Sequence, residues 1–499
     1  MNSFQNKKIL KKTELGVTLS SAKMMRLAMR NLLLLVLYAG LLTYSIYTFV
    51  VILQSESLSA FKKASNPAST AFARTFASQI RLSLAISLLT SCRATWTCIG
   101  DMTGVDASAN TVHIHAGVVL LIASIGHSIS HYVNFILLHT HHVMHLRSSF
   151  LHRASITGHV LLLLIALIAV SSFMRRLMQW ECFEVLHWLI IPFTVITCIH
   201  GIFCFIRAND WSCIKATAWM WVVGPAVLCV LDWCWRCWRV RKKINLLKLI
   251  RHSGGIIELH FQAPCLRYRA GQYILLRRQG SVQWHPFTLT SAPEDLNPSV
   301  HVRICGDWTK DLAKSLGVNG DHDYVAPVKF PWFRIDGPFG TPSQAYHRYK
   351  RILLIGAGIG QTPFASILRS LWYRRSGERH VTYIGIMRQP QPFEWFFDVL
   401  RVLESSQDNM RLDISLWITG SMNAERVKVL YHLNDATVDP LTGLNARTSF
   451  GRPPLKKILE DESTSNEWVA VFYCGPKALA NQICRYCGSL GLHFYRERF

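Results

Sequence analysis

The apolar run VHIHAGVVLLIASIGHSISHYVNFIL, residues 112–137, decides the architecture of this chain. It exceeds the ~20 residues that a helix needs to cross the bilayer core. Four histidines nevertheless lie within it, at His113, His115, His127 and His131. An ionisable side chain inside a membrane helix costs about 2.5–3.5 kcal/mol or more and therefore indicates a function by default. For any one of these histidines taken alone, a hydrogen-bonded core position is the simpler interpretation.

The rest of the first half has the same apolar character. The 499 residues are 50% hydrophobic and 17% charged, with a mean hydropathy of +0.20, which is too apolar for an ordinary soluble chain. Five further runs have spanning length: 31–53, 74–98, 156–173, 183–205 and 217–238. The run 31–53 lacks a cleavage-site pattern, so we interpret it as an anchor and not as a signal peptide. We expect a six-span membrane domain over residues 31–240.

The formal net charge of +24 has its cause in basic clusters that flank the apolar runs, as at 239–243. This is the pattern of the positive-inside rule. With a basic amino terminus inside, six spans place both termini in the cytosol of a multi-pass plasma-membrane or endomembrane protein in contact with lipid. No nucleic-acid-reading motif accompanies the charge, so we exclude a nucleic-acid partner. Residues 1–30 form a cytosolic basic segment, either an amphipathic helix on the inner leaflet or a solvated tail.

Histidine spacing tests whether two spans hold a metal cofactor. His113 and His127 are 14 residues apart, about 40° from a common helix face and ~21 Å apart along the axis. His187 and His200 are 13 apart in the fifth run, which is ~140° in an ideal helix, but Pro192 between them can re-aim the chain. Neutral imidazole is a ligand of haem iron. Because the third and fifth spans run parallel, we expect His113 to pair with His187 and His127 with His200, around two haems.

After Lys243 the pattern changes to short strands. The segments GIIELHF (255–261), QYILLR (272–277), HPFTLT (285–290) and HVRIC (301–305) predict a small antiparallel β-barrel over residues 244–345. From Arg351 strands alternate with helices, beginning with RILLIG, the Gly-rich turn GAGIGQTP and the helix FASILRSLWYRR. This alternation is typical of a doubly wound α/β domain, which we place at 346–499. The stretch 405–466 contains polar segments that we expect to be loops.

The Gly-rich turn follows a buried strand and opens a helix, so its backbone N–H groups can bind a pyrophosphate. The residues expected there are Gly356, Gly358, Gly360, Thr362 and Pro363. Arg388 follows the next strand, which favours a 2′-phosphate and hence NADPH.

In the barrel, one strand offers an aromatic ring and hydroxyls for a flavin and its ribityl chain. The residues concerned are His285, Pro286, Phe287, Thr288, Leu289 and Thr290. Arg303, on the next strand, can neutralise the flavin pyrophosphate.

These motifs resemble those of the NADPH oxidase family, within the ferric-reductase-like transmembrane superfamily, over essentially the whole chain. The motifs that carry the resemblance are QWHPFTLTSAP (283–293), HVRICGDWT (301–309), DGPFGT (336–341), GAGIGQTPFASIL (356–368), FEWF (393–396), YCGPKALA (473–480) and the terminal Phe499. The resemblance implies a six-helix haem-binding bundle followed by a ferredoxin-reductase-like module, a β-barrel FAD domain plus an α/β NADPH domain. It also implies FAD, two b-type haems and NADPH as electron donor.

Several residue roles come from the resemblance alone. Cys474, with Gly475 and Pro476, would lie beside the nicotinamide, and Phe499 would cover the flavin. Ser291 would join the FAD set. Arg74 and His131 would lie near the outer haem, where dioxygen would be reduced to superoxide or hydrogen peroxide. This scheme is compatible with small regulatory proteins, in the membrane or the cytosol, as partners.

Two features keep other acceptors open. The loop after His200, which holds Cys204 and Cys213, is short, and the loop after the third span is rich in histidine: His139, His141, His142, His145 and His152. That second loop is either solvated or a site for a metal ion or chelate. The alternative function is therefore a ferric- or cupric-chelate reductase with the same electron path. A membrane scaffold or proton-conducting protein with a degenerate reductase tail is a second alternative. Gln361 replaces the apolar residue usual in the Gly-rich motif, and we expect little effect from it.

Overall fold

The structure is a computed structural model. It describes residues 35–103, 109–175, 177–178, 180–203, 205–206, 209, 216–263, 266–319, 323–324, 330–375, 379–405, 411–420, 438–464 and 467–497. The expected amino-terminal segment, Cys204, Cys213 and Phe499 lie outside these residues. The described residues form two compact units. The helical unit lies within Asn31–Trp96 and Ser108–Trp235, and the sheet unit within Thr97–Ala107 and Arg236–Phe499.

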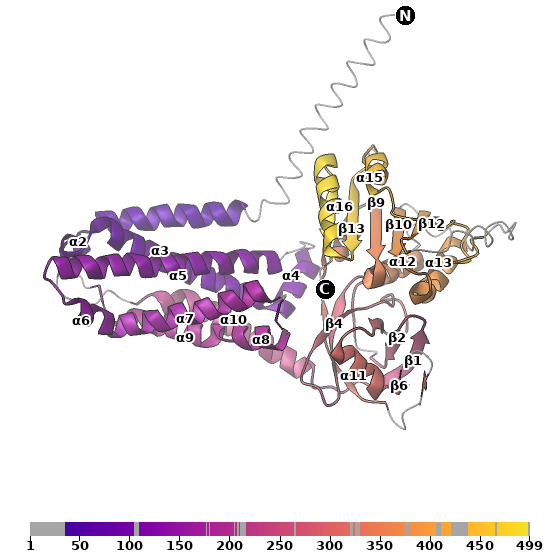
Figure 1. Cartoon of the computed structure of the whole chain (residues 1–499), viewed down its shortest axis with the longest axis horizontal. Coiled ribbons are helices and arrows are strands. Elements are labelled where there is room, and N and C mark those ends of the chain that lie inside the picture. The colour runs from indigo at the N-terminus through magenta and orange to yellow at the C-terminus, as the bar shows by residue number, and fades with distance from the viewer. Residues whose placement is uncertain are drawn as a thin grey trace, which may run out of the picture. The chain divides into compact units, whose positions relative to one another are not determined.

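The helical unit contains helices long and apolar enough to cross a membrane (Figure 1). Five pass this test singly among the described residues: Leu35–Gln54, Ala109–Thr140 (α5), Arg153–Met174 (α7), Glu181–Phe203 and Ala218–Arg239 (α10). A sixth span is possible only if the bent pair of α3 (Pro67–Ser91) and α4 (Arg93–Thr103) counts as one. Shorter helices α2 (Ser59–Ala64) and α6 (Leu146–Leu151) connect the long ones.

The expectation of one continuous helix over 74–98 is therefore wrong. The helix begins earlier, at Pro67, because the Asn66 side chain accepts hydrogen bonds from the Ala68 and Ser69 amides. It ends at Ser91, and the chain turns by 77° into α4. The buried Asp232 carboxylate accepts from the backbone N–H and the hydroxyl of Thr95, both at 2.8 Å, which holds the start of α4.

The fifth apolar run is also interrupted. It consists of α8 (Trp180–His187) and α9 (Ile190–His200), with a break at Trp188 and Leu189. Pro192 explains the break, because its nitrogen cannot donate to the Trp188 carbonyl and its ring crowds that carbonyl. The break changes the angular relation of His187 and His200, which an ideal helix would place ~140° apart.

Apolar packing holds the bundle together. α3 packs along α5, and α7 packs along α8 and α9. The buried core consists of Leu84, Leu120, Ile165, Ile168, Phe193 and Val222. Many apolar side chains on the outward faces remain exposed, as at Leu163 and Ile122. Such exposed apolar faces require lipid around them.

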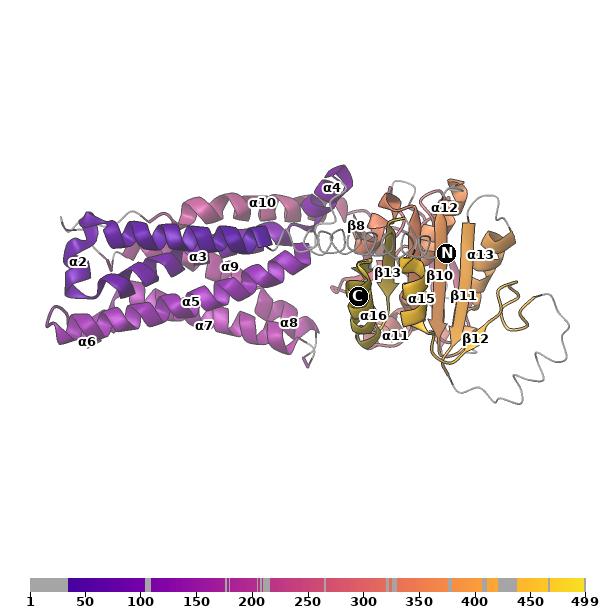
Figure 2. The same cartoon turned by 90° about the horizontal axis from the view of Figure 1, so that it is seen from above.

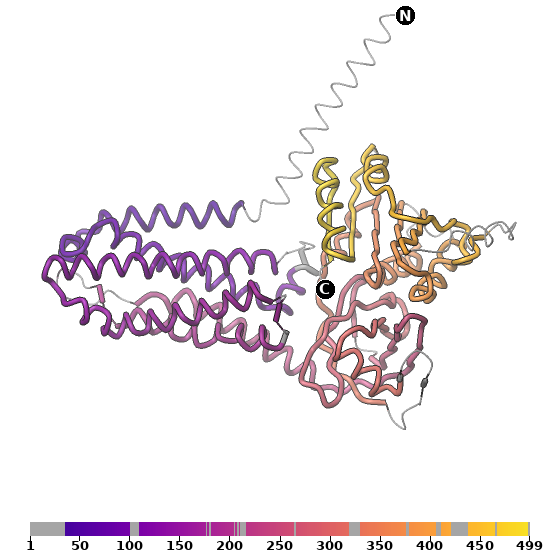
Figure 3. The backbone as a smooth tube through the Cα atoms, viewed as in Figure 1, coloured from indigo at the N-terminus to yellow at the C-terminus, as the bar shows by residue number. Residues whose placement is uncertain are grey.

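The first part of the sheet unit is a small antiparallel barrel, whose backbone path can be followed in Figure 3. One sheet has the order β1-β2-β5, formed by Leu246–His252, Ile256–Phe261 and Ser299–Arg303. The second has the order β4-β3-β8, formed by His285–Thr288, Tyr273–Arg278 and Phe333–Phe339. A short pair, β6 (Val318–Asn319) and β7 (Asp323–Tyr324), and the helix α11 (Asp307–Ser315) complete it. The Leu289–Val300 bridge joins the two main sheets.

The second part is a six-stranded parallel sheet with the order β12-β11-β10-β9-β13-β14. In chain order these strands are β9 (Arg351–Ala357), β10 (His380–Met387), β11 (Arg411–Ile418), β12 (Ser449–Phe450), β13 (Val469–Cys474) and β14 (His493–Arg496). The chain starts at β9, moves outward through β10 to β12, and then returns to the other side of β9. The strand order therefore reverses between β9 and β13, where open α/β sheets bind ligands.

Helices cover both faces of this sheet (Figure 2). They are α12 (Thr362–Tyr373) and α13 (Glu394–Ser405) on one face and α15 (Leu455–Ser463) and α16 (Lys477–Leu490) on the other. Alternate residues of β9 face the two layers, as Leu354 and Leu353 do. The expectation of loops in the polar stretches of 405–466 is wrong at α15. That helix buries only Leu455, Leu459 and Glu462, which is too weak a pattern to predict a helix.

Candidate functional site

The helical unit brings four of its histidines together as two pairs. The ring centroids of His113 and His187 are 6.1 Å apart, and those of His127 and His200 are 6.3 Å apart. These are the pairs that the spacing argument requires. A metal–imidazole bond of about 2.0–2.1 Å, plus roughly 1.2 Å from nitrogen to ring centre, places two opposed rings about 6.4 Å apart. One iron therefore fits between the rings of each pair.

Hydrogen bonds orient three of these rings. His127 Nδ1 donates to the Ala73 carbonyl at 2.8 Å, and His113 Nδ1 donates to the Ser87 carbonyl at 3.1 Å. His200 Nδ1 lies 2.8 Å from Thr157 Oγ1. This hydroxyl donates to the Arg153 and Ala154 carbonyls, so it accepts from the histidine. Occupation of Nδ1 leaves Nε2 free, as metal-binding histidines require. The residues therefore fit a haem at each pair.

Close packing of α3 against α5 adds to this order. A Cβ at Gly126 would lie 2.6 Å from the Phe76 ring, so only glycine permits this approach without displacing the ring. Gly126 directly precedes His127. The approach brings the Ala73 carbonyl of α3 within reach of His127 on α5.

The surroundings of the His127–His200 pair contain the two residues expected at the electron acceptor. The His131 ring lies 4.6 Å from the His127 ring and 5.9 Å from the Phe205 ring. Arg74 directly follows Ala73, whose carbonyl accepts from His127 Nδ1. The structure thus places Arg74 and His131 next to one histidine pair.

The histidine-rich loop does not gather into a metal site among the residues that the structure describes. His141 Nδ1 donates to the Ala64 carbonyl at 2.8 Å, and His152 Nδ1 accepts from the Ala154 amide at the start of α7. His142 has a positive φ of 53° and lies in a turn. Hydrogen bonds and a turn thus account for these three histidines.

In the sheet unit, the predicted dinucleotide residues meet at the carboxyl ends of adjacent strands. Gly356 of β9 pairs with Gly385 of β10 and with Cys474 of β13. Arg388 directly follows β10. Gly358 has φ +61° at the turn after β9, a conformation that L side chains rarely adopt. The turn, the arginine and the cysteine therefore lie at one edge of the sheet, and Thr362 and Pro363 begin α12 there.

Two close approaches define this edge. A Cβ at Gly360 would lie 2.4 Å from the Cys474 carbonyl oxygen, so the turn lies directly against the end of β13. Gly475 has φ +154°, and a Cβ there would meet the Ala357 side chain at 2.7 Å. Pro476 then caps α16. The backbones after β9 and β13 consequently border the same crevice.

Cys474 itself is a neutral thiol. Burial raises the pKa of Cys474 well above its ordinary value, and the negative charge of Glu497 raises it further. A buried thiol of this kind is inert as a nucleophile. No sequence motif points to Glu497, whose carboxylate accepts from the Ser343 amide at 2.8 Å.

Gln361, the departure from the usual Gly-rich motif, also lies in this turn. Its side chain is fully buried, and neither its amide nitrogen nor its oxygen has a hydrogen-bond partner among the described residues. A buried polar group left unsatisfied costs about 1–3 kcal/mol. A ligand bound in the crevice would supply hydrogen bonds to the Gln361 side chain. An apolar residue at this position would have no polar atoms to satisfy.

The predicted flavin segment forms β4 and the turn that follows it. His285 packs on the Trp308 ring, with centroids 4.2 Å apart, and Phe287 lies 5.7 Å from the same ring. Thr288, Leu289, Thr290 and Ser291 are buried, whereas Pro286 and Arg303 are exposed. The Ser291 carbonyl accepts from Ser366 Oγ of α12 at 2.6 Å, which ties the barrel to the dinucleotide domain.

Three family models match successive parts of the chain. The ferric reductase like transmembrane component matches residues 77–198. The FAD-binding domain matches residues 241–343, and the ferric reductase NAD binding domain matches residues 349–488. The fold class expected from the sequence is confirmed: a multi-pass membrane domain is followed by a reductase module that binds FAD and NAD(P).

Relatives with curated names extend over most of this length. The chain is 32% identical over 398 residues to NADPH oxidase 3 of Homo sapiens, a match that covers 69% of each protein. It is 31% identical over 399 residues to a superoxide-generating NADPH oxidase heavy chain of Dictyostelium discoideum, covering 73% of this chain and 75% of that one. A second such heavy chain of the same organism is 34% identical over 377 residues, and there the match spans only 53% of the relative's length. On this evidence the chain belongs to the NADPH oxidase family.

Proposed function

We propose that this chain is a transmembrane NADPH oxidase, which passes electrons from NADPH through FAD and two b-type haems to dioxygen and so forms superoxide. Two observations together support the proposal. The helical unit contains two histidine pairs, whose ring centroids lie 6.1 and 6.3 Å apart within each pair. The same chain contains FAD-binding and NAD-binding domains. When bound, flavin accepts a hydride and haem iron carries single electrons, which joins a two-electron donor to a one-electron path.

The dinucleotide edge supplies the donor side. Backbone N–H groups of Gly358 and Gly360, at the start of α12, would bind the pyrophosphate. Arg388 would pair with the 2′-phosphate. Cys474 would border the nicotinamide as a neutral thiol, which neither attacks the ring nor places a charge beside it. Phe499 keeps its proposed place over the flavin, although it lies outside the described residues.

The barrel supplies the flavin side. We place the ring and the ribityl chain along His285 to Ser291 and the pyrophosphate at Arg303, which is exposed at the end of β5. The hydrogen bond from Ser366 to the Ser291 carbonyl would hold this segment close to the dinucleotide domain. The domain limits that we propose remain 31–240, 244–345 and 346–499.

The acceptor side lies at the His127–His200 pair. His127 and His200 would both bind the iron of a haem, which would supply single electrons, so dioxygen would bind beside this pair and not between the two imidazoles. Arg74 would stabilise the negative charge of superoxide as it forms. His131, one helical turn beyond His127, would line the same place. We propose that this pair faces away from the cytosol and that both termini lie in the cytosol.

The decisive experiment identifies the product. The purified full chain with FAD and haem, given NADPH in air, should reduce cytochrome c in a manner that superoxide dismutase abolishes. The same preparation without oxygen should reduce ferric chelates only slowly. Rapid anaerobic reduction of ferric chelate without any superoxide in air would instead establish the chelate reductase.

Arg388→Ala should weaken NADPH binding and leave NADH almost unchanged. A charge-assisted hydrogen bond contributes about 1.5–3 kcal/mol, so the KM for NADPH should rise about 10-fold to 150-fold. Steady-state flavin reduction with each nucleotide measures this effect. Arg375→Ala is the matched control, because Arg375 is exposed just after α12, at the opposite end of that helix from the Gly-rich turn, and should affect neither KM. An equal loss with NADPH and NADH would contradict the phosphate role of Arg388.

A further inference from the structure

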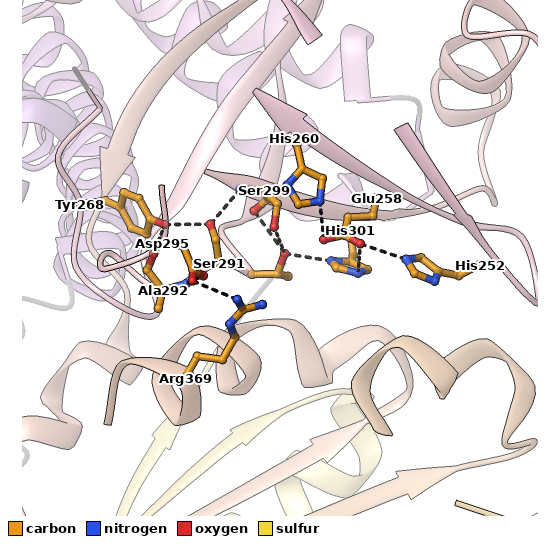
Figure 4. Close-up of polar contacts among 11 residues, drawn as sticks. His252, Glu258, His260, Tyr268, Ser291, Ala292, Asp295, Ser299, His301 and Arg369 are labelled. Atoms are coloured by element: carbon orange, nitrogen blue, oxygen red, sulfur yellow. Dashed lines mark hydrogen bonds and ion pairs between the residues drawn. The ribbon is translucent and has the colours of Figure 1, made fainter. Parts of the chain in front are cut away.

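We propose that His252, Glu258 and His301 form a binding site for a divalent transition-metal ion, of which Zn²⁺ fits best. The three side chains come from β1, β2 and β5 of the barrel and converge on one carboxylate (Figure 4). Their ligand atoms all lie within 4.8 Å of one another. The site is separate from the histidine pairs and from the dinucleotide edge.

Strand register places these residues on one face of the sheet. Glu258 and His301 are directly opposite in the antiparallel β2–β5 pair. His252 is opposite Ile256 of β2, two residues from Glu258 and therefore on the same face. Three short strands thus present a carboxylate and two imidazoles to one point.

The distances suit a metal ion. The His252 Nε2–Glu258 Oε2 distance is 3.1 Å, and the His301 Nε2–Glu258 Oε2 distance is 3.6 Å. In a tetrahedral zinc site with bonds of about 2.0–2.1 Å, neighbouring ligand atoms lie ~3.3 Å apart. The two observed distances lie on either side of this value. Small rotations of the imidazoles would therefore complete the geometry.

The hydrogen bonds of His301 leave its second nitrogen without a partner. Thr290 Oγ1 lies 3.2 Å from the Ser299 carbonyl and 2.8 Å from His301 Nδ1, so this hydroxyl can donate to the carbonyl and accept from Nδ1. With the proton on Nδ1, a lone pair remains on Nε2, which is buried, has no hydrogen-bond partner among the described residues and lies 3.6 Å from Glu258 Oε2. A cation between this nitrogen and the carboxylate would satisfy both electron-pair donors.

His260 holds the carboxylate from its other side. Its Nε2 lies 2.9 Å from the other carboxylate oxygen of Glu258. Imidazole and carboxylate ligands suit Zn²⁺, which takes four of them in structural sites. The three strands present no thiolate at this point, so soft ions that require sulfur fit less well.

A bound ion would fix the flavin segment. The His301 ring stacks on the Trp395 ring, with centroids 3.8 Å apart, and its Nδ1–H holds Thr290. A metal on Nε2 would lock this ring and strengthen its bond to Thr290. The site would therefore stabilise the barrel next to the proposed FAD contacts.

Zinc retention by matched variants tests the site. The full chain with FAD and haem, purified through a histidine-free tag, is stripped with EDTA, exposed to Zn²⁺ and desalted, and its metal is measured by mass spectrometry. The wild type should retain about one more Zn²⁺ per chain than Glu258→Gln or His252→Asn. The affinity of both variants for Zn²⁺ should fall at least about 10-fold. The histidine-rich loop is the same in every variant and contributes an equal background.

His380→Asn is the matched control, because His380 also binds a carboxylate, that of Asp413, but has no second imidazole there. It should retain zinc as the wild type does. Equal retention in all variants, or equal loss in His380→Asn, would overturn the proposal.

X-ray absorption at the zinc edge tests the site in the wild type alone, so the test does not depend on whether a variant folds. Haem does not interfere, because it contains no zinc. Nitrogen and oxygen ligands with imidazole scattering are expected. Sulfur ligands would refute the site.

Discussion

Replacing His127 by leucine should remove about half of the haem absorbance, because each pair of histidines holds one of two haems. Electron transfer would then stop within the membrane, and superoxide formation should fall by more than about 10-fold. Loss of a residue that only hydrogen-bonds a metal ligand already lowers activity about 10-fold or more, and loss of the ligand itself should lower it further. Reduction of FAD by NADPH should continue, because the dinucleotide edge and the barrel are unchanged. Absorbance spectra and stopped-flow flavin reduction measure the two effects.

His115→Leu is the matched control for this variant. His115 lies on the same helix, two residues from His113, and its Nδ1 bonds to the Tyr38 hydroxyl instead of facing a second imidazole. It should retain both haems. Full haem content in His127→Leu would show that the pairing of His127 with His200 is wrong.

Replacing Gly360 by alanine should abolish most NADPH-driven flavin reduction. The added Cβ would lie 2.4 Å from the Cys474 carbonyl oxygen, and this neighbour is backbone, which cannot rotate away. Overpacking of this kind typically costs about 1–3 kcal/mol. The strain falls between the turn after β9 and the end of β13, where the dinucleotide should bind. Haem absorbance should be unaffected, because the histidine pairs lie in the other unit.

Gly488→Ala provides the comparison. Gly488 lies in α16, and nothing lies within 4 Å of the position that its Cβ would take. Alanine is better than glycine in a helix by about 1 kcal/mol, so this variant should be as stable as the wild type or more stable. Thermal unfolding and flavin reduction are measured on both variants. Equal behaviour of the two would refute the close approach as the cause.

Much of the haem site could be predicted from spacing alone. Fourteen residues return a helix almost to the same face, so His113 and His127 point the same way in any straight helix. The relation of His187 to His200 could not be predicted, because it depends on the break at Trp188 and Leu189. The sequence indicates such a break only through Pro192, which does not determine the new direction of the chain.

The residues of the dinucleotide edge could also be predicted from the sequence, but the contacts between them could not. The strand–turn–helix pattern around Gly356 to Pro363 is local, so the sequence contains it whole. The approach of Gly360 to Cys474 joins positions more than a hundred residues apart. It depends on the return of β13 to the side of β9.

The amino-acid sequence by itself therefore determined the membrane helices, the parallel sheet and the histidines and glycines that serve them, because hydrophobic period and local spacing are properties of a continuous segment. The tertiary structure alone decided which imidazoles face each other across helices, why Gly360 admits no side chain, and how His252, Glu258 and His301 meet. The physical reason is that strand register and helix packing bring distant residues within bonding distance, and no local pattern encodes those distances.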